Sequence, residues 1–315
     1  MKSKTETKSS PLKIVGVIAI IFLVFIGIGL FFLVIGLLMV GSSGSHDSGN
    51  VALISISGPI YVSGSSGLFA EPVTSSESIV EQIKDAAADD SVVAIMFEIN
   101  SPGGSGVASD EIAQAIRNSG KPTISYIREV GASGAYWVAS ATDKIYANRF
   151  STVGSIGVIA SYIEVSHLLT RYNMTYQRFV AGDNKDFGTP FREPTASERK
   201  RFQAQLDQLH TLFIEEVAYG RNLDESYVRS IADGFVWTGQ SALDAGLIDE
   251  IGGKDEAVQY IEDMFNISVN LKEYYQEPSF LEMLGGFISD FGHSIGLGIG
   301  EKMAPQLSQE IVIRT

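Results

Sequence analysis

Asn-Ser-Pro-Gly-Gly at residues 100–104 and Gly-Ala-Ser-Gly-Ala at residues 131–135 each follow a run of mostly apolar residues. The first run is Val92 to Ile99, and the second is Thr123 to Val130. A glycine pair at the end of a strand lets the backbone turn its N–H groups outward. A small-residue turn that leads into a helix presents one serine at the positively polarised helix start. Together the two segments predict an oxyanion hole and a serine nucleophile.

Apolar runs alternate with amphipathic segments around these two motifs. We predict strands at residues 51–56, 92–99, 123–130, 144–147, 155–160, 175–180 and 269–275. We predict helices at residues 75–88, 108–118, 133–141, 195–220, 224–232, 238–245 and 254–265, and a short one near 165–172. Thr195 and Glu198 have the spacing of a capping box at the start of the longest of these helices. This alternation is typical of the α/β class.

Residues 14–40 form a stretch of 27 residues without a charge. As a helix it would be about 40 Å long, against about 30 Å for the hydrocarbon core of a bilayer, so we expect one N-terminal transmembrane helix. Four lysines precede it, and no Lys or Arg follows it before Lys84, which predicts a cytoplasmic amino end. The rest of the chain is then extracytoplasmic. Cleavage within the small residues 41–45 is the alternative to a retained anchor.

The predicted parts of the chain follow from these patterns. They are a cytoplasmic N-terminus (1–13), a transmembrane anchor (14–40), a flexible linker (41–50), a folded domain (51–275) and an amphipathic C-terminal tail (276–315). The apolar face of the tail suits either a membrane or a neighbouring subunit, and a frayed tail is the alternative.

Composition excludes several classes of function. The chain has no cysteine, which excludes disulfides, zinc–thiolate sites and thiol catalysis. It carries 23 Lys and Arg against 37 Asp and Glu, a net charge of −14. A nucleic-acid-binding protein needs a basic footprint, so we expect no nucleic-acid partner.

A serine nucleophile needs a group that accepts its proton. Of the four histidines, one lies in the linker, one in the tail and one in the middle of a predicted helix, which leaves only His167. The turn around Ser133 also departs from the G-x-S-x-G pattern. Lys185 is the better candidate, because it lies in a polar loop bounded by glycines, at residues 181–188.

Five motifs in order give the chain a family resemblance. They are N-S-P-G-G (100–104), S-G-A-Y-W-V-A-S-A-T-D-K-I-Y-A (133–147), V-G-S-I-G-V (153–158), K-D-F-G-T-P-F-R (185–192) and I-A-D-G (231–234). With them the segment from Val51 to Tyr275 resembles the signal peptide peptidases of the SppA type. These are membrane serine proteases with a Ser–Lys dyad on a ClpP/crotonase-like fold.

The resemblance implies a role for six residues. They are the nucleophile Ser133, the general base Lys185, the lysine-orienting Ser155, and the oxyanion donors Gly103 or Gly104 together with Gly134. The family usually has Gly-Gly-Tyr-Tyr after the nucleophile, whereas this chain has Gly-Ala-Tyr-Trp at residues 134–137. That difference leaves the Gly134 N–H in place and changes the side chains around it, where core packing is the expected role of the two aromatic rings.

A lysine serves as a base only when its amine is neutral. Its usual pKa of about 10.4 must fall toward about 7–8, which burial among apolar groups achieves. Nearby carboxylates oppose that shift, so we expect Asp183 and Asp186 to point away from the amine.

The resemblance implies hydrolysis of signal peptides and other unfolded chains, without a cofactor or a metal, by a homo-oligomer of about eight copies. Two alternatives stay open. One is a crotonase-type acyl-CoA enzyme, which also uses N–H groups at strand ends and needs carboxylates in its site. The other is a membrane-tethered scaffold that binds peptides without cutting them.

Overall fold

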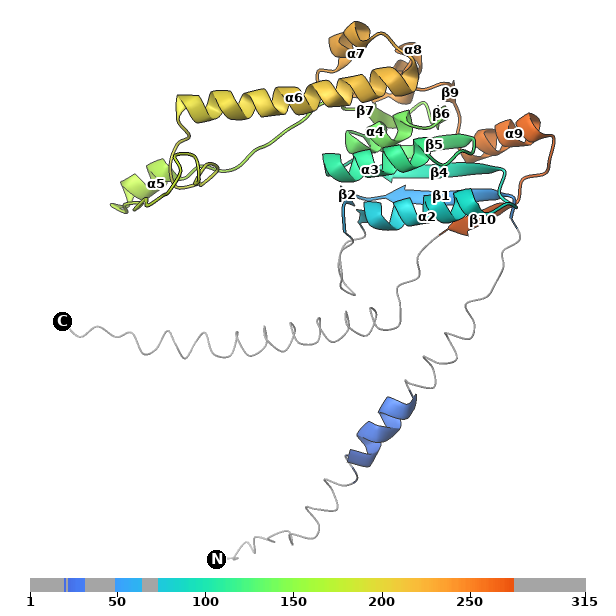
Figure 1. Ribbon diagram of the computed structural model, residues 1–315, viewed down its shortest axis with the longest axis horizontal. Coiled ribbons are helices and arrows are strands. Elements are labelled where there is room, and N and C mark those ends of the chain that lie inside the picture. The colour runs from blue at the N-terminus through green and yellow to red at the C-terminus, as the bar shows by residue number, and fades with distance from the viewer. Residues whose placement is uncertain (1–19, 21, 32–48, 64–72, 275–315) are drawn as a thin grey trace, which may run out of the picture.

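The computed structural model describes residues 20, 22–31, 49–63 and 73–274 (Figure 1). A parallel sheet with the strand order β10-β1-β4-β5-β6-β9 lies at its centre. Its strands are β1 (Val51–Ser57), β4 (Ala94–Ser101), β5 (Thr123–Ala132), β6 (Lys144–Ala147), β9 (Glu250–Ile251) and β10 (Leu271–Tyr274). The α/β class predicted from the sequence is confirmed.

Helices cover both faces of this sheet. On one face α2 (Ser76–Ala88), α3 (Gly106–Arg117) and α4 (Gly134–Ser140) pack on side chains such as Ile54 and Phe97. On the other face α9 (Lys254–Phe265) packs on side chains such as Leu53 and Met96. Successive residues of a strand point to opposite faces, so the first four residues of β1 and of β4 are all apolar because they contribute to both cores.

Short strands extend the sheet beyond the end of β5. β7 (Thr152–Gly154) pairs in parallel with the last residues of β5, and β8 (Val236–Thr238) pairs antiparallel with β7. A separate parallel pair is formed by β2 (Ile60–Tyr61) and β3 (Thr74–Ser75). An isolated bridge joins Ile60 to Gly104, so this small pair lies against the glycine motif.

An arm, here defined as residues 158–195, leaves the body of the molecule after β7 and contains α5 (Ser166–Arg171) (Figure 1). The long helix α6 (Ala196–Arg221) leads back to the body, where α7 (Glu225–Ile231) and α8 (Gly239–Asp244) follow. No residue of the arm is buried, and all of its residues are described. Three large apolar side chains are the most exposed, namely Ile159 at 86%, Ile163 at 81% and Phe179 at 91%.

Two predicted strands are wrong. Residues 155–160 and 175–180 form no strand. Residues 158–160 and 175–180 lie in the arm, where no neighbouring strand pairs with them, and residues 155–157 follow the end of β7 without joining a strand. The two- and three-residue strands β2, β3, β7, β8 and β9 were not predicted, since such short runs carry little periodicity. The other predicted elements are present within a few residues of the expected bounds, including the capping box of Thr195 and Glu198.

Among the residues that the structure describes, no helix is both long and apolar enough to cross a membrane. Most of the predicted anchor (14–40) and most of the linker (41–50) lie outside the described residues. The N-terminus (1–13) and the tail (276–315) lie wholly outside them.

Candidate active site

Ser133 stands at the sharp turn between β5 and α4. Its backbone angles are φ 52° and ψ −127°, a left-handed conformation that a residue with a side chain rarely adopts. The amide of Ser133 donates a 2.7 Å hydrogen bond to the carbonyl oxygen of Gly154 at the end of β7. Its carbonyl oxygen accepts hydrogen bonds from the amides of Tyr136 and Trp137 in the first turn of α4. Both sides of the strained residue are therefore fixed by the fold.

The glycine motif lies beside this turn because β4 and β5 are neighbours. A register shift after Ile99 brings Ser101 opposite Gly131. The side-chain oxygen of Asn100 accepts a 3.2 Å hydrogen bond from the amide of Val130. The hydroxyl of Ser101 accepts a 3.1 Å hydrogen bond from the amide of Gly103. These contacts join the end of one motif to the start of the other.

Three glycines bring the two motifs into close backbone contact. Gly103 has φ +92°, and a Cβ atom on it would lie 2.5 Å from the amide nitrogen of Gly134. A Cβ atom on Gly104 would collide with the carbonyl oxygen of Ile60. A Cβ atom on Gly134 would lie 3.2 Å from the amide nitrogen of Gly104. Close packing therefore requires glycine at all three positions, and the positive φ of Gly103 favours glycine there as well.

The amides of Gly104 and Gly134 are close to one another and to Ser133. Neither N–H group donates to an acceptor within the described residues, although the neighbouring amides of Gly103 and Ser105 both do. Gly134 also begins α4, where the amides carry the positive end of the helix dipole. Two unpartnered N–H groups beside a serine are the arrangement that stabilises the oxyanion of an acyl transfer.

Lys185 lies elsewhere in the single chain. It belongs to a series of turns between α5 and α6, and its amide donates to the carbonyl oxygen of Gly182 at 3.0 Å. Its side chain is exposed, and no hydrogen bond joins it to Ser133 among the described residues. Figure 1 shows α5 and the start of α6 at the end of the molecule away from α4. One copy of the chain does not bring the serine and the lysine together.

Ser155 lies beside the nucleophile turn, because it directly follows Gly154, which holds the Ser133 amide. It too has a positive φ, of 53°. Its hydroxyl donates to the carbonyl oxygen of Gly234 at 3.1 Å, and its amide donates to that of Phe235 at 3.0 Å. In the single chain Ser155 is near the serine and not near the lysine.

The two aromatic residues after the nucleophile are packed in the interior. Tyr136 is fully buried, and its hydroxyl donates to the carbonyl oxygen of Leu247 at 2.7 Å. Burial raises the pKa of the Tyr136 phenol. The ring of Trp137 stacks on Phe213 of α6 with a centroid separation of 4.9 Å. Both rings anchor α4, as expected from the sequence.

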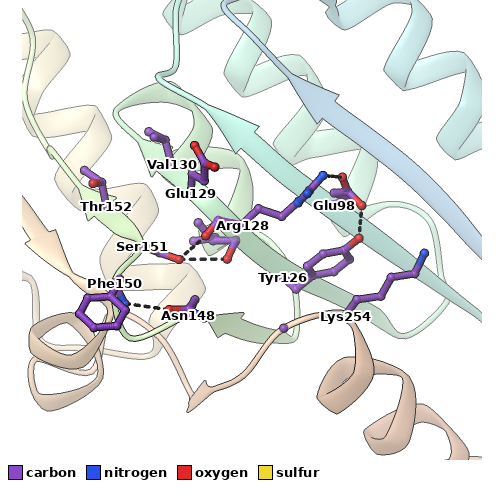
Figure 2. Close-up of a pocket in the computed structure, with 12 residues that line it drawn as sticks. Glu98, Tyr126, Arg128, Glu129, Val130, Asn148, Phe150, Ser151, Thr152 and Lys254 are labelled. Atoms are coloured by element: carbon purple, nitrogen blue, oxygen red, sulfur yellow. Dashed lines mark hydrogen bonds and ion pairs between the residues drawn. The ribbon is translucent and has the colours of Figure 1, made fainter.

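A separate cavity of about 870 Å³ lies beside the C-terminal half of β5, at the start of α9 (Figure 2). Its serine, Ser151, donates to the carbonyl oxygens of Ile127 and Arg128. Glu98, one of its two carboxylates, accepts hydrogen bonds from Tyr126 and Arg128. Ser151 is therefore bound to backbone carbonyl oxygens, and no hydrogen bond joins it to a base among the described residues.

Sequence reasoning missed the residues that hold the turn in place. Asn100 and Ser101 were read only as part of a motif, yet their side chains bind the neighbouring strand and loop. Ile60 and Gly154 gave no signal, because their contribution is a backbone carbonyl group. The polar pair Asn-Ser at the end of an apolar run was the one available sign of the side-chain contacts.

Comparison with known proteins identifies the class. The family model "Peptidase family S49" matches residues 115–268. A protein of Methanocaldococcus jannaschii that is named as a protease is 33% identical over 238 residues, which cover 75% of this chain and 76% of the relative. A protein of Enterococcus faecium that is named as a signal peptide peptidase SppA is 33% identical over 66% of this chain and 61% of its own length. Protease 4 of Haemophilus influenzae is 31% identical over 69% of this chain, which spans only 35% of that longer protein.

The chain therefore belongs to peptidase family S49. It is a serine peptidase of the SppA type. This membership favours the peptidase over the acyl-CoA enzyme and over the non-catalytic scaffold.

Proposed function

We propose that the protein is a membrane-anchored endopeptidase that cleaves unfolded peptides, signal peptides among them, with Ser133 as the nucleophile. One observation carries the proposal. Ser133 is held in a strained turn beside two backbone amides, those of Gly104 and Gly134, that donate to no acceptor within the described residues. Strain and unpaired donors at one position are features of a catalytic centre.

The proposed reaction has two halves. Lys185 accepts the hydroxyl proton as the Ser133 oxygen attacks the substrate carbonyl, and the resulting oxyanion is bound by the amides of Gly104 and Gly134. The lysine then gives the proton to the departing amine, and an acyl-enzyme forms on Ser133. Water attacks the acyl-enzyme with Lys185 again as the base, which releases the acid and restores the serine hydroxyl.

The lysine would come from a neighbouring copy of the chain. The arm that carries Lys185 has no buried residue and exposes Ile159, Ile163 and Phe179 almost completely. Apolar surface of this extent is typical of a surface that binds a partner. A head-to-tail contact, in which each arm reaches the next body, closes into a ring. Such a ring, of about eight copies, would bury the arm and bring a Lys185 amine to each Ser133.

Assembly would also provide the dry surroundings that a neutral amine requires. Lys185 is exposed in one copy, whereas a neighbour's body would cover it. Ser155 then has a role, because its hydroxyl beside Ser133 can orient the incoming amine. The two halves of the site would meet only when the ring has formed, which keeps a free subunit from cleaving other proteins.

The likeness to SppA peptidases supports signal peptides as substrates, and the apolar stretch at residues 14–40 supports a location at the membrane. We propose that this stretch anchors the chain with its amino end in the cytoplasm and the folded domain, on the ClpP/crotonase-like fold, outside. An anchored site lies near the apolar peptides that remain in a bilayer after precursor cleavage.

Labelling of the purified full-length protein with a fluorophosphonate tests the nucleophile. We expect a covalent adduct at Ser133, located by peptide mass spectrometry, and a parallel loss of cleavage of an unfolded reporter. Ser140, a buried serine of the adjacent helix, is the matched control, and Ser140→Ala should label as the original protein does. An adduct at another serine, with Ser133 unmodified and activity lost, contradicts the proposal.

A further inference from the structure

The loop that carries Lys185 is fixed by the residue that follows the lysine. The carboxylate of Asp186 accepts two hydrogen bonds from Arg178, one from Nε at 2.7 Å and one at 2.9 Å. It accepts two more from Arg192, one from Nε at 2.8 Å and one at 2.9 Å. The two guanidinium groups together lower the pKa of Asp186 well below its usual range. All of this carboxylate's main acceptor positions are thus used by two arginines.

The same contacts connect the loop to the start of α6. Arg192 donates at 2.9 Å and 2.6 Å to the carboxylate of Glu198. Glu198 in turn accepts a 2.7 Å hydrogen bond from the amide of Thr195, as the second half of the capping box. The chain of contacts therefore runs from Asp186 through Arg192 into the first turn of a 26-residue helix. A long helix gives the lysine loop a rigid support.

The residue after Asp186, Phe187, holds the loop against α6 by an apolar contact. The ring of Phe187 lies 4.9 Å, centroid to centroid, from the ring of Phe202 on α6. Lys185 is exposed, whereas Asp186 and Phe187 are partly buried and bound. The lysine is thus presented to the outside by a backbone that is fixed on its C-terminal side.

We propose that Asp186 is a positioning residue, which holds the Lys185 backbone at the angle that delivers the amine to Ser133 of the neighbouring copy. The inference rests on the proposed function. It also explains how a carboxylate is tolerated next to a base, because two guanidinium groups pair with the carboxylate and compensate its charge. Neutralising Asp186 leaves Arg178 and Arg192 facing one another without the carboxylate between them, so the loop loses its fixed geometry.

Asp183 provides a matched control in the same loop. It lies two residues before Lys185, as Asp186 lies one residue after it, and it carries the same charge. Its carboxylate has no hydrogen bond or ion pair within the described part of the chain, where only its backbone oxygen accepts a bond, from Arg178. Asp183→Asn therefore removes the same charge without removing an anchor.

The test is the rate of fluorophosphonate acylation at Ser133 as a function of pH, in the assembled full-length protein. At the high-pH plateau the lysine is neutral in every variant, so differences in the plateau rate report geometry and not the protonation of the amine. We expect Asp186→Asn to lower the plateau about tenfold or more. Asp183→Asn should leave the plateau rate unchanged. Asp186→Glu keeps the carboxylate, so its plateau rate should recover, on a logarithmic scale, at least half of the loss seen in Asp186→Asn.

The outcomes separate this inference from the proposed function. If Ser133 of the original protein is not acylated, or if Lys185→Ala acylates normally, the dyad itself is wrong. If Lys185→Ala is slow but Asp186→Asn reaches the original plateau, the dyad stands and the positioning role is contradicted. Equal losses in Asp183→Asn and Asp186→Asn also contradict it, because charge alone would then account for the effect.

A second variant covers failure of Asp186→Asn to assemble, which sedimentation velocity would reveal. Arg192→Lys keeps the positive charge. Its ammonium group lacks the planar guanidinium donors with which Arg192 binds Asp186 and Glu198 at the same time. We expect it to assemble and to lower the plateau at least threefold. An assembled Arg192→Lys with the original plateau rate contradicts the inference.

Discussion

The amide of Ser133 and the carbonyl oxygen of Gly154 are joined by a 2.7 Å hydrogen bond between the ends of β5 and β7. This bond lies next to a backbone conformation that costs about 1–3 kcal/mol for a residue with a side chain. The fold therefore uses a short strand, β7, to hold the serine in a position that the local sequence does not favour. The result is a serine held beside two unpartnered amides, those of Gly104 and Gly134.

Substitution of Ser133 should separate activity from stability. Both Ser133→Ala and Ser133→Gly remove the nucleophile and should abolish cleavage. Glycine relieves the positive φ, whereas alanine does not, so we expect Ser133→Gly to be more stable than Ser133→Ala by about 1 kcal/mol. Thermal unfolding of the two variants measures the difference. A lower melting temperature for the glycine variant would mean that the turn is not strained.

The glycine motif gives a second contrast. A methyl group on Gly104 collides with the Ile60 carbonyl oxygen, so Gly104→Ala should destabilise the protein by about 1–3 kcal/mol and displace an oxyanion donor. Gly106, two residues later at the start of α3, has open space around the same position. Gly106→Ala should be active and at least as stable as the original protein. Chemical denaturation and reporter cleavage would show both effects, and a Gly104→Ala variant with the original stability and activity would mean that the collision does not displace this amide.

Lys185 allows a test of the base. Lys185→Ala removes the amine, and Lys185→Arg replaces it with a guanidinium group that stays charged at any accessible pH, so both should lose cleavage by at least a hundredfold. Lys200, an exposed lysine of the first turns of α6, is the control, and Lys200→Ala should keep normal activity. Steady-state cleavage of an unfolded reporter is the measurement. Substantial turnover by Lys185→Arg would show that the lysine is not the base.

We expect the stability of the protein to depend on pH through Glu198, the carboxylate of the capping box of α6. Hydrogen bonds from Arg192 lower the pKa of Glu198 from 4.5 to about 2. A carboxyl whose pKa is lowered by folding contributes stability above its unfolded value of about 4.5, and that contribution is lost as the pH falls toward about 2. Glu198→Gln should therefore melt at a lower temperature than the original protein at pH 6, and the difference should narrow as the pH approaches 2. A difference that stays constant over this range would mean that the charge of Glu198 plays no part.

Most of the fold, but only part of the candidate site, could be predicted from the sequence. The core strands were predictable because Ile54, Phe97 and their neighbours fill two apolar faces, and the nucleophile turn was predictable from its small residues. The runs 155–160 and 175–180 were misjudged because an apolar run predicts burial but not the partner that provides it. The contacts of Asp186 and Gly154 join residues far apart or on separate turns, which local patterns do not show.

The separation of Ser133 and Lys185 in one copy has a functional meaning. In the proposed ring the site is divided between two copies and is active only in the assembly, so the apolar surface of the arm would govern catalysis as well as association. Under that proposal, Ile159 and Phe179 would help to bring the lysine to the neighbouring serine by packing against the next copy.

Mixing two inactive variants tests the central claim most directly. Ser133→Ala supplies only the lysine and Lys185→Ala supplies only the serine, so each alone should be inactive. In a ring in which every site takes its serine from one copy and its lysine from the next, an equal random mixture should recover about a quarter of the original activity. Reporter cleavage after dissociation and reassembly of the mixture is the measurement. Recovery near that level is the expected result, and a fully reassembled mixture without activity would contradict a serine and a lysine shared between neighbouring copies.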